Sequence, residues 1–389
     1  MAFLKNLIHK PITGEWGTDV GKVNILRTTN FTNSGVLDFS DVVKRNVSEK
    51  KVEQKKLLKG DIIIEKSGGS PKQPVGRVVF FDKEGIYLCN NFTSILRPKK
   101  DKVEPKYLHY LLYGSHRFGV TGMYQNKTTG IINLQLPRYV NKLEIPLPPL
   151  NIQKKIAQIL DDAASLRDKT TRLLKEYDLL AQSIFLEMFG DPLINPKGWE
   201  KAPLKKLGKT TTGNTPSRAV PKYYGRFIEW IKTDNINTPN MYLTKAEEFL
   251  SEIGLTKARK VNEGAILVTC IAGSKRVIGN VAIANRLVSF NQQINAFEAF
   301  NSCYLFWYYH FILAKAYVQN NSTNGMKGII TKGKFEKMMF FNPPIEFQNQ
   351  FAEKIALIEE QKELAKQELK ESEDLFNCLL QKAFKGELV

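Results

Sequence analysis

Apolar residues recur in two long stretches of the chain at alternating spacings of four and three positions. The first stretch covers residues 151–189, and the second repeats its register 195 residues later; in each, nine of eleven seam positions are apolar. Sustained spacing of this kind forms the seam of a coiled coil. Neither stretch contains Pro or Gly, and each spans more than five heptads. The pattern predicts two long helices, and the alternative is that each helix packs only on its own domain.

The seam that we expect to be buried includes Ile152, Ile156, Leu160, Leu174, Tyr177 and Ile184 in the first helix, and Phe347, Phe351, Ile355, Ile358, Leu369, Phe376 and Leu379 in the second.

Local signals mark the ends of the first helix. Asn151 follows Pro148-Pro149 and is a suitable N-cap, while Gly190 before Asp191-Pro192 is a stop signal. A helix of about 40 residues is roughly 60 Å long. If the two seams pack together, chain connectivity requires the helices to be antiparallel.

Four segments recur in the same order, with a period near 200 residues. LPPLNIQKKIAQIL (147–160) matches NPPIEFQNQFAEKI (342–355), and GDIIIEKSGGS (60–70) matches GAILVTCIAGS (264–274). ILRTTNF matches WIKTDNI, and Tyr107-Leu108 matches Tyr304-Leu305. A duplicated two-part unit explains these matches. It predicts a first basic domain at 1–146, a central helix at 147–190, a second basic domain at 191–341 and a C-terminal helix at 342–389; the resemblance described below implies that the domains are target recognition domains and the helices spacers.

Each of the two domains contains both strand and helix patterns. KGDIIIEKSGG is a β-rich run that ends in a Gly turn, and VGRVVFF and NVAIA are further predicted strands. KYLHYLLYGSHRF and CYLFWYYHFILAKAYV are predicted helices. Because strands and helices do not alternate regularly, we expect an α+β fold. The expected architecture is two similar domains separated by two long antiparallel coiled-coil helices, with pseudo-two-fold symmetry.

The positive charge of the chain is concentrated in the two predicted domains. The net charge is +18, of which residues 1–150 and 191–345 each carry +11, while residues 151–190 carry 0 and residues 346–389 carry −4. A basic block is the footprint of a polyanion partner, because neutralising phosphates releases counterions. A solvated basic surface is the alternative for either block alone.

Cysteine spacing and hydropathy bear on metal sites, disulfides and the cellular compartment. The four cysteines form no C-x-x-C pair, so neither a zinc site nor a disulfide framework is predicted. The N-terminus lacks a long apolar core, and no run of 18 apolar residues occurs. We therefore expect a cytoplasmic protein with no membrane partner.

Several polar segments have the residue types that contact DNA. Glycines let backbone N–H groups approach phosphates, Lys and Arg neutralise them, and Arg and Asn suit base edges. Ordinary turns and strand ends are the alternatives for these segments. The candidate DNA-binding residues are Arg27, Thr28, Thr29, Asn30, Lys66, Ser67, Gly69, Ser70, Lys72, Arg77, Asn91, Lys127, Thr128, Thr215, Ser217, Arg218, Lys232, Thr233, Asp234, Ser274, Lys275, Arg276, Gln292 and Lys327.

No catalytic residue and no metal site are predicted. Asn342-Pro343-Pro344-Ile345 is similar to the N-P-P-aromatic motif of adenine-N6 methyltransferases, but Ile345 cannot stack on a flipped base. The other repeat has Leu147 in place of Asn342, and no glycine-rich S-adenosylmethionine loop accompanies the motif. No P-loop occurs, and the four His are dispersed. We interpret the prolines as a helix-start signal.

These segments together resemble the specificity subunit of type I restriction–modification systems. The resemblance rests on LRTTNF, GDIIIEKSGGS, VGRVVFF, TTGIINL and EIPLPPLNIQKKIAQIL in the first unit, and on TPSR, KYYGRFIEWIKTDNI and NPPIEFQNQFAEKI in the second. It implies two target recognition domains that each bind half of a split double-stranded DNA site. It also implies helices that set the gap and dock two modification subunits. The partners would also include a restriction subunit that translocates along DNA and cleaves it. S-adenosylmethionine, ATP and Mg would be bound by these partner subunits.

Two departures from the family pattern are visible. The first unit lacks the W-x-x-x-x-L-x-x-L lead that GWEKAPLKKLG provides in the second, which leaves its N-terminal edge open. The domains also differ strongly outside the framework, so different half-sites are expected. The alternatives are the recognition module of another defence system, a lone DNA adenine methyltransferase, and a scaffold that binds RNA or acidic proteins.

Overall fold

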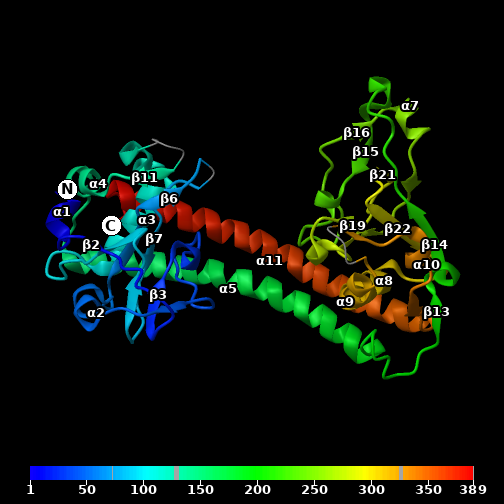
Figure 1. The fold of residues 1–389 in the computed structure, drawn as a ribbon, viewed down its shortest axis with the longest axis horizontal. Helices are drawn as coiled ribbons and strands as arrows, with labels where there is room; N and C mark the ends of the chain where they lie inside the picture. The colour runs from blue at the N-terminus through cyan, green and yellow to red at the C-terminus, as the bar shows by residue number, and fades with distance from the viewer. Residues whose placement is uncertain (72, 127–130, 324–326, 389) are drawn as a thin grey trace. The chain divides into compact units, whose positions relative to one another are not determined.

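The structure is a computed structural model that describes residues 1–71, 73–126, 131–323 and 327–388. The chain forms two compact units, and each of the two long helices contributes to both of them (Figure 1). Unit 1 comprises Met1–Thr171 and Gln367–Val389, and unit 2 comprises Arg172–Lys366. Each unit is therefore built from one basic domain and a part of each helix.

Unit 1 contains short strands and helices grouped around a four-stranded sheet. Its strands are β1 (Ala2–Phe3), β2 (Ile12–Thr13), β3 (Val23–Leu26), β4 (Val43–Arg45), β5 (Ile62–Glu65), β6 (Ser67–Gly69), β7 (Val78–Phe80), β8 (Tyr87–Cys89), β9 (Thr93–Leu96), β10 (Gln125–Asn126), β11 (Ile132–Leu134) and β12 (Glu144–Ile145). Its helices are α1 (Leu4–Leu7), α2 (Glu49–Lys55), α3 (Pro105–Arg117) and α4 (Leu136–Lys142), with 3₁₀ turns η1 (Thr28–Asn30) and η2 (Val120–Tyr124).

Unit 2 repeats most of these parts in the same order, with small additions. Its strands are β13 (Lys201–Pro203), β14 (Gly208–Thr212), β15 (Tyr224–Ile231), β16 (Phe249–Leu250), β17 (Lys260–Val261), β18 (Ile266–Thr269), β19 (Ile271–Ala272), β20 (Val281–Ile283), β21 (Val288–Phe290), β22 (Ile294–Ala299), β23 (Gly328–Ile329) and β24 (Met339–Phe341). Its helices are α6 (Leu204–Leu207), α7 (Glu252–Leu255), α8 (Tyr304–Leu313), α9 (Lys315–Asn320) and α10 (Lys332–Glu336), with 3₁₀ turns η4 (Pro221–Tyr223), η5 (Thr233–Asn235) and η6 (Lys275–Val277).

The sheets of the two units correspond strand by strand. The main sheet has the order β2-β9-β5-β7 in unit 1 and β14-β22-β18-β20 in unit 2. A second sheet, β4-β3-β8 in unit 1 and β16-β15-β21-β17 in unit 2, contains one parallel pair in each case. The predicted α+β class and the internal duplication are therefore confirmed.

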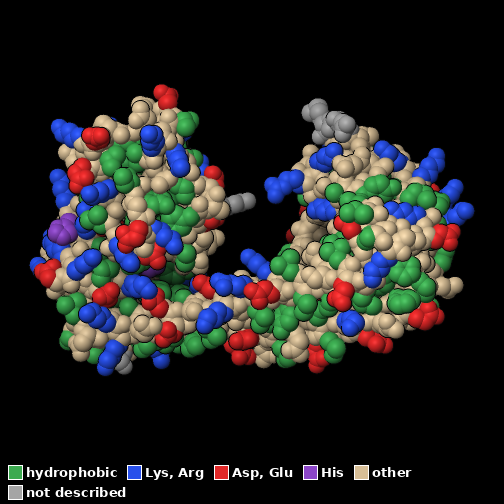
Figure 2. Space-filling view, turned by 90° about the horizontal axis from the view of Figure 1, so that it is seen from below, with side chains coloured by type: hydrophobic (Ala, Val, Ile, Leu, Met, Phe, Trp, Pro, Cys, Tyr) green, Lys and Arg blue, Asp and Glu red, His purple; other side chains and the backbone are tan. Residues whose placement is uncertain are grey.

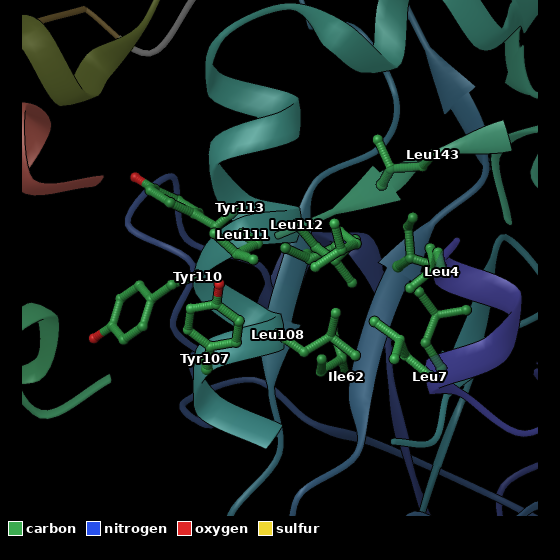
Figure 3. Packing of buried hydrophobic residues seen from close by; sticks show 14 of the residues in the cluster. Leu4, Leu7, Ile62, Tyr107, Leu108, Tyr110, Leu111, Leu112, Tyr113 and Leu143 are labelled. Atoms are coloured by element: carbon green, nitrogen blue, oxygen red, sulfur yellow. The ribbon is translucent and has the colours of Figure 1, made fainter. Parts of the chain in front are cut away.

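Each unit has a core in which an apolar helix covers the main sheet. In unit 1, Leu108, Leu111 and Leu112 of α3 pack with Ile62 of β5 and with Leu4 of α1 (Figure 3). In unit 2 the corresponding helix α8 supplies Phe306, Trp307 and Phe311, which are fully buried. The predicted helices KYLHYLLYGSHRF and CYLFWYYHFILAKAYV are thus core elements, although the second divides at Ala314 into α8 and α9.

The two long helices are α5 (Leu150–Phe189) and α11 (Ile345–Lys385), and they pack antiparallel within each unit. In unit 2, Phe185 contacts Phe351 with ring centroids 5.5 Å apart, while the Asp178 carboxylate lies 2.8 Å from Lys362 Nζ. In unit 1 the Arg167 guanidinium lies 4.9 Å from the centre of the Phe376 ring. Residues of decreasing number along α5 contact residues of increasing number along α11, so the predicted antiparallel coiled-coil helices are confirmed.

Six of the thirteen seam residues named from the sequence are buried. Ile156, Leu160, Phe351, Ile355 and Ile358 are all buried. Phe376 is buried too, whereas Ile152, Leu174, Tyr177, Ile184, Leu369 and Leu379 are partly exposed.

The seam prediction is wrong at the helix ends. Phe347 is 44% exposed, and Phe185 and Phe189 are fully buried in place of the neighbouring seam position Ile184. A straight helix has 3.6 residues per turn, so a 3.5-residue pattern drifts around it by about 20° per heptad. The buried face at the end of α5 is therefore displaced by one position.

Three smaller predictions at element boundaries are also corrected. Helix α5 begins at Leu150, so Asn151 lies inside the helix and is not its N-cap. The Gly turn predicted at the end of KGDIIIEKSGG is replaced at Ser67–Gly69 by strand β6, which pairs with β11. The first unit does carry the lead of the second in shortened form, since β1 pairs with β12 as β13 pairs with β24. Leu4-x-x-Leu7 of α1 corresponds to Leu204-x-x-Leu207 of α6.

Two buried histidines, His109 on α3 and His310 on α8, predict an acid-sensitive fold. Burial lowers the pKa of His109 to about 4 and that of His310 to about 3. The unfolded chain titrates near pH 6.5, so below that pH it binds more protons than the folded chain and stability falls. At pH 5 each histidine should cost roughly 2 kcal/mol.

Urea unfolding of the whole chain at pH 7, 6 and 5 measures this loss. The double variant His109→Gln, His310→Gln should lose less stability between pH 7 and pH 5 than the wild type does. His9→Gln, at an exposed position, is the matched control and should keep the wild-type pH dependence. If the double variant lost as much free energy of unfolding between pH 7 and pH 5 as the wild type does, the two histidines would not be the cause of the acid sensitivity.

Candidate nucleic-acid interface

The topology of unit 2 brings four predicted segments to one end of its sheets. Strands β14 and β18 end there, and the antiparallel strand β22 begins there, with Thr212 opposite Asn295 and Thr269 opposite Ile294. The parallel strands β15 and β21 end there as well, since Asn291 N–H donates to Ile231 O. We call this region the strand-end edge of unit 2; it consists of residues 213–218, 232–235, 270–277 and 291–293.

Unit 1 has the same edge, built from the equivalent strand ends. Lys66 N–H donates to Phe92 O over 2.9 Å, and Asn90 N–H donates to Leu26 O over the same distance. Arg77 lies there too, because Glu65 N–H donates to its carbonyl. The strand-end edge of unit 1 consists of residues 14–16, 27–30, 66–70, 77 and 90–92.

A glycine permits the close packing of each edge. A Cβ at Gly14 would lie 2.0 Å from Asn90 O, and a Cβ at Gly213 would lie 2.1 Å from Asn291 O. Any side chain at these two positions would collide with backbone, so only glycine fits. The sheet and the turn are held together at equivalent points in both units.

Predicted candidates of unit 2 meet around Trp230. The Arg218 guanidinium lies 4.7 Å from the centre of the Tyr224 ring and 5.3 Å from that of Trp230. Lys232 Nζ lies 5.5 Å from the Trp230 ring. Both cations bind the carboxylate of Glu248, with Arg218 Nη2 at 2.6 Å. Residues far apart in the sequence thus form one basic and aromatic cluster.

Glu248 holds this cluster in one arrangement. Its burial would raise the pKa of the carboxyl, but hydrogen bonds from Lys232 and Arg218 outweigh that effect and leave the pKa below its ordinary value. The carboxylate therefore stays charged at neutral pH and fixes the two cations. Thr215 completes this side of the edge, because its hydroxyl donates to Gln292 Oε1.

A second basic group of unit 2 lies on η6. Lys275 and Arg276 are exposed, and within the described part of the chain no carboxylate forms an ion pair with either. Ser274 caps this turn by accepting the N–H of Arg276. The carbonyls of Lys275 and Arg276 accept from the Gln319 amide, so the backbone is anchored while both cationic ends face solvent.

Two predicted candidates in unit 1 have structural roles, so they are corrected. Asn30 is 2% exposed and caps η1: its Oδ1 accepts Arg27 N–H, and its Nδ2 donates to the carbonyls of Asp38 and Asp41. The Arg77 side chain forms an ion pair inside the protein, with Nε 2.8 Å from Glu65 Oε2. A buried side chain whose polar groups are already used has none left for DNA.

Arg77 also supports its neighbours on the edge. Its guanidinium donates to Thr28 O and to Phe31 O, each over 3.3 Å. It therefore fixes the turn that carries Arg27, Thr28 and Thr29. Arg27 itself lies 2.8 Å from the exposed carboxylate of Asp41, an ion pair that water and salt weaken.

The β6 segment of unit 1 is exposed at some positions and buried at others. Gly69 is buried and pairs with Ile132, which excludes it from DNA contact and corrects that prediction. Ser67 donates to Asn133 Oδ1 over 2.5 Å, and Ser70 is exposed. Burial lowers the pKa of the half-buried Lys66. A nearby phosphate would compensate for that partial loss of hydration.

The remaining candidates take various places. Asn91, Ser217, Asp234 and Lys327 are exposed, and Thr233 is half-buried in η5. Lys72, Lys127 and Thr128 lie outside the described residues.

Sequence reasoning missed several residues beside the edges. Arg45 stacks on Trp16 at 4.4 Å, and Lys55 Nζ lies 2.9 Å from Glu15 Oε2. The hydrogen bond from Lys55 is the main cause that lowers the pKa of Glu15. Arg259 N–H donates to Asn214 Oδ1 and its guanidinium to Thr212 O. The alternation of aromatic and basic residues in YYGRFIEWIK was a signal that could have located the Trp230 cluster.

Asn342 of the N-P-P sequence has a structural role. Its Oδ1 accepts hydrogen bonds from Ser302 Oγ and Gln348 Nε2, at 3.0 and 2.9 Å. These bonds join the start of α11 to the loop before α8, as expected for a helix-start signal.

Basic side chains are spread over the visible surface of each unit among acidic ones (Figure 2). Among the described residues, no three His, Cys, Asp or Glu side chains gather where they could hold a metal ion. No helix among these described residues has both the length and the hydropathy needed to cross a membrane.

Comparison with known proteins agrees with this architecture. A model of the family described as type I restriction modification DNA specificity domain matches residues 12–176 and 196–373. The chain is 21% identical to a putative type I restriction enzyme MjaX specificity subunit of Methanocaldococcus jannaschii, over 94% of this chain and 87% of the relative. It is 31% identical to the type I restriction enzyme HindI specificity subunit of Haemophilus influenzae, over 26% and 21% of the two chains.

Solved structures show the same fold. A chain from a study of complex assembly and conformational transition of the type I R-M system matches with a TM-score of 0.58 and 17% identity, covering 100% of this chain and 97% of that one. The S subunit of the type I restriction-modification system from M. genitalium matches with a TM-score of 0.51 and 16% identity, covering 98% and 95%.

Two similar basic units with equivalent strand-end edges define a tandem DNA-recognition protein. The family model covers most of the chain, one match in each repeat. The chain belongs to the family of type I restriction–modification DNA specificity domains, and its role is DNA recognition.

Proposed function

We propose that each unit binds one half of a bipartite, asymmetric DNA site through its strand-end edge. The observation that carries this proposal is the convergence of separately predicted segments on the same end of the sheets in both units. Lys275, Arg276 and Lys66 would contact phosphates, while Thr215, Gln292 and Asn91 would approach base edges. The remaining described candidates of the two edges, apart from the three corrected above, belong to the same proposed surface.

The differences between the two edges support an asymmetric site. Unit 2 has the Trp230 cluster with its two cations, whereas unit 1 has the Trp16–Arg45 pair. A shared framework with different side chains should bind two different short sequences. Tandem modules held at a fixed spacing read half-sites at a fixed spacing.

The long helices complete the proposal. We infer that α5 and α11 set the gap between half-sites, and that they dock two modification subunits. The chain itself would be non-catalytic: S-adenosylmethionine would be bound by the modification subunits, and ATP and Mg by a restriction subunit. Methylation of adenine and cleavage of DNA would then be activities of the partners, in the cytoplasm.

Salt dependence of binding tests the edge directly. The affinity of the chain, co-expressed with its modification subunit, for its duplex should fall linearly with salt concentration on a double-logarithmic plot, with a slope of about −0.9 for each phosphate contacted. Fluorescence anisotropy measures this slope. Replacing Lys275 and Arg276 together with glutamine should reduce it by up to about 2, because two phosphate contacts are lost.

The matched control is the pair Lys205 and Lys206 on α6. Both are exposed adjacent cations of the same unit, but α6 precedes Gly208 at the opposite end of β14. Their replacement with glutamine should leave the slope unchanged. Equal effects of the two double variants, or binding that ignores salt, would refute the proposed interface.

A further inference from the structure

At the tip of the unit 1 edge lies an apolar ring that the proposed polar contacts do not explain. Phe92 is 48% exposed, although residues around it, Asn91, Lys66 and Ser67, are polar. Single exposed apolar side chains are common on proteins, so exposure alone does not indicate a binding role for Phe92. The backbone around Phe92, however, holds the ring in a defined position.

Phe92 occupies a fixed position in a tight turn. Thr93 N–H donates to Asn90 O over 3.1 Å, which makes Asn91 and Phe92 the two central residues of a β-turn. The Phe92 carbonyl accepts two further N–H groups, from Lys66 at 2.9 Å and from Ser67 at 3.2 Å. The turn is thus tied to the end of β5, and the ring projects from a rigid base.

The chain leaves the space beside the ring open. Residue 68, next to it, is a glycine, and a Cβ there would come within 4.0 Å of Phe92 Cδ1. Gly68 also has φ +93°, which only glycine adopts readily. No side chain of this neighbour therefore covers the ring.

The equivalent turn of unit 2 has a different character. Ile294 N–H donates to Asn291 O, so Gln292 and Gln293 are its central residues and Gln293 corresponds to Phe92. The Gln293 amide is used inside the protein, since its Oε1 accepts from Asn291 Nδ2 at 3.0 Å. Only unit 1 presents an apolar group at this position.

We propose that Phe92 contacts the 5-methyl group of a thymine in the half-site of unit 1. The major groove offers one apolar group that distinguishes bases, the thymine methyl, and an aromatic ring among polar contacts gains most by burying against it. This inference rests on the proposed function of the edge. It makes Phe92 a specificity-determining residue and gives a physical reason for different half-sites.

Deoxyuridine substitution tests the contact, because it removes only the methyl group. After the site has been identified by selection from random duplexes with the complete complex, each thymine of the unit 1 half-site is replaced in turn. Wild-type affinity should fall about three- to tenfold at one thymine. The Phe92→Ala complex should bind the unmodified duplex with a similar loss, and should not respond to replacement of that thymine.

Phe300→Ala is the matched control. Phe300 is 54% exposed but follows β22 at the end remote from the edge, so this variant should respond to deoxyuridine as the wild type does. A Phe92→Ala complex that still responds at the sensitive thymine would overturn the inference, as would the absence of any sensitive thymine. A wild-type complex without preference for a defined duplex would instead refute the proposed function.

Discussion

Replacing Glu65 with alanine should destabilise unit 1 by about 3–5 kcal/mol. The side chains of Glu65 and Arg77 are only 5% and 11% exposed, and two parallel hydrogen bonds of 2.8 and 3.0 Å join them. Removing the carboxylate leaves the guanidinium buried without a counter-charge, and the cost of that isolated charge dominates. Chemical denaturation of the full chain measures the loss of free energy of unfolding.

The same substitution should weaken DNA binding. Arg77 holds the carbonyls of Thr28 and Phe31, so its displacement releases the turn that presents Arg27 and Thr29. Anisotropy with the complete complex should show reduced affinity at temperatures where the variant remains folded.

An exposed ion pair of the same unit provides the control. Glu53 pairs with Lys56 at 2.9 Å, but its side chain is 75% exposed, so Glu53→Ala should change the stability little. Changing Glu65 and Arg77 together to methionine should recover part of the stability lost by Glu65→Ala, because no unpaired charge remains. Equal losses for Glu65→Ala and Glu53→Ala would contradict this assignment.

Replacing Phe351 with alanine should destabilise unit 2 by about 3–5 kcal/mol. Phe351 is fully buried where α11 meets α5, with ring centroids 5.5 Å from Phe185, 5.6 Å from Phe189 and 5.4 Å from Tyr309. Truncation leaves a cavity among rings that are anchored from several elements and cannot easily close it. Tryptophan fluorescence during denaturation reports on this unit, because Trp199, Trp230 and Trp307 all belong to it.

The matched control is Phe347, one helical turn earlier on α11. It is 44% exposed, and its ring lies near that of Trp199, with centroids 6.0 Å apart. Phe347→Ala should cost clearly less than Phe351→Ala. Similar losses for both would mean that the aromatic cluster does not carry the packing of the two helices.

The contrast between these two phenylalanines illustrates a limit of sequence patterns. Both belong to the same predicted seam, and the pattern assigns them equal weight. The structure buries Phe351 and exposes Phe347, because the residues that cover each position come from other parts of unit 2. Burial depends on these distant partners, which a local period does not contain.

The candidate site shows the same division. The residues of the edges were predicted from composition, and their convergence followed only from strand order. Asn30 and Arg77 have the residue types of DNA contacts, but burial and internal hydrogen bonds make them structural. Phe92 has the residue type of a core position, but it lies exposed at the tip of a turn.

The sequence by itself determined the duplication, the two long helices, the concentration of positive charge in the two domains and the family. These features are periodic, compositional or repeated, so the order of residues along the chain is enough to recognise them. Only the tertiary structure decided which polar residues face solvent at the strand-end edges and which are buried in hydrogen bonds within the protein. That choice depends on contacts between segments such as Thr28 and Arg77, or Arg218 and Glu248, whose hydrogen bonds form only when the strands are paired.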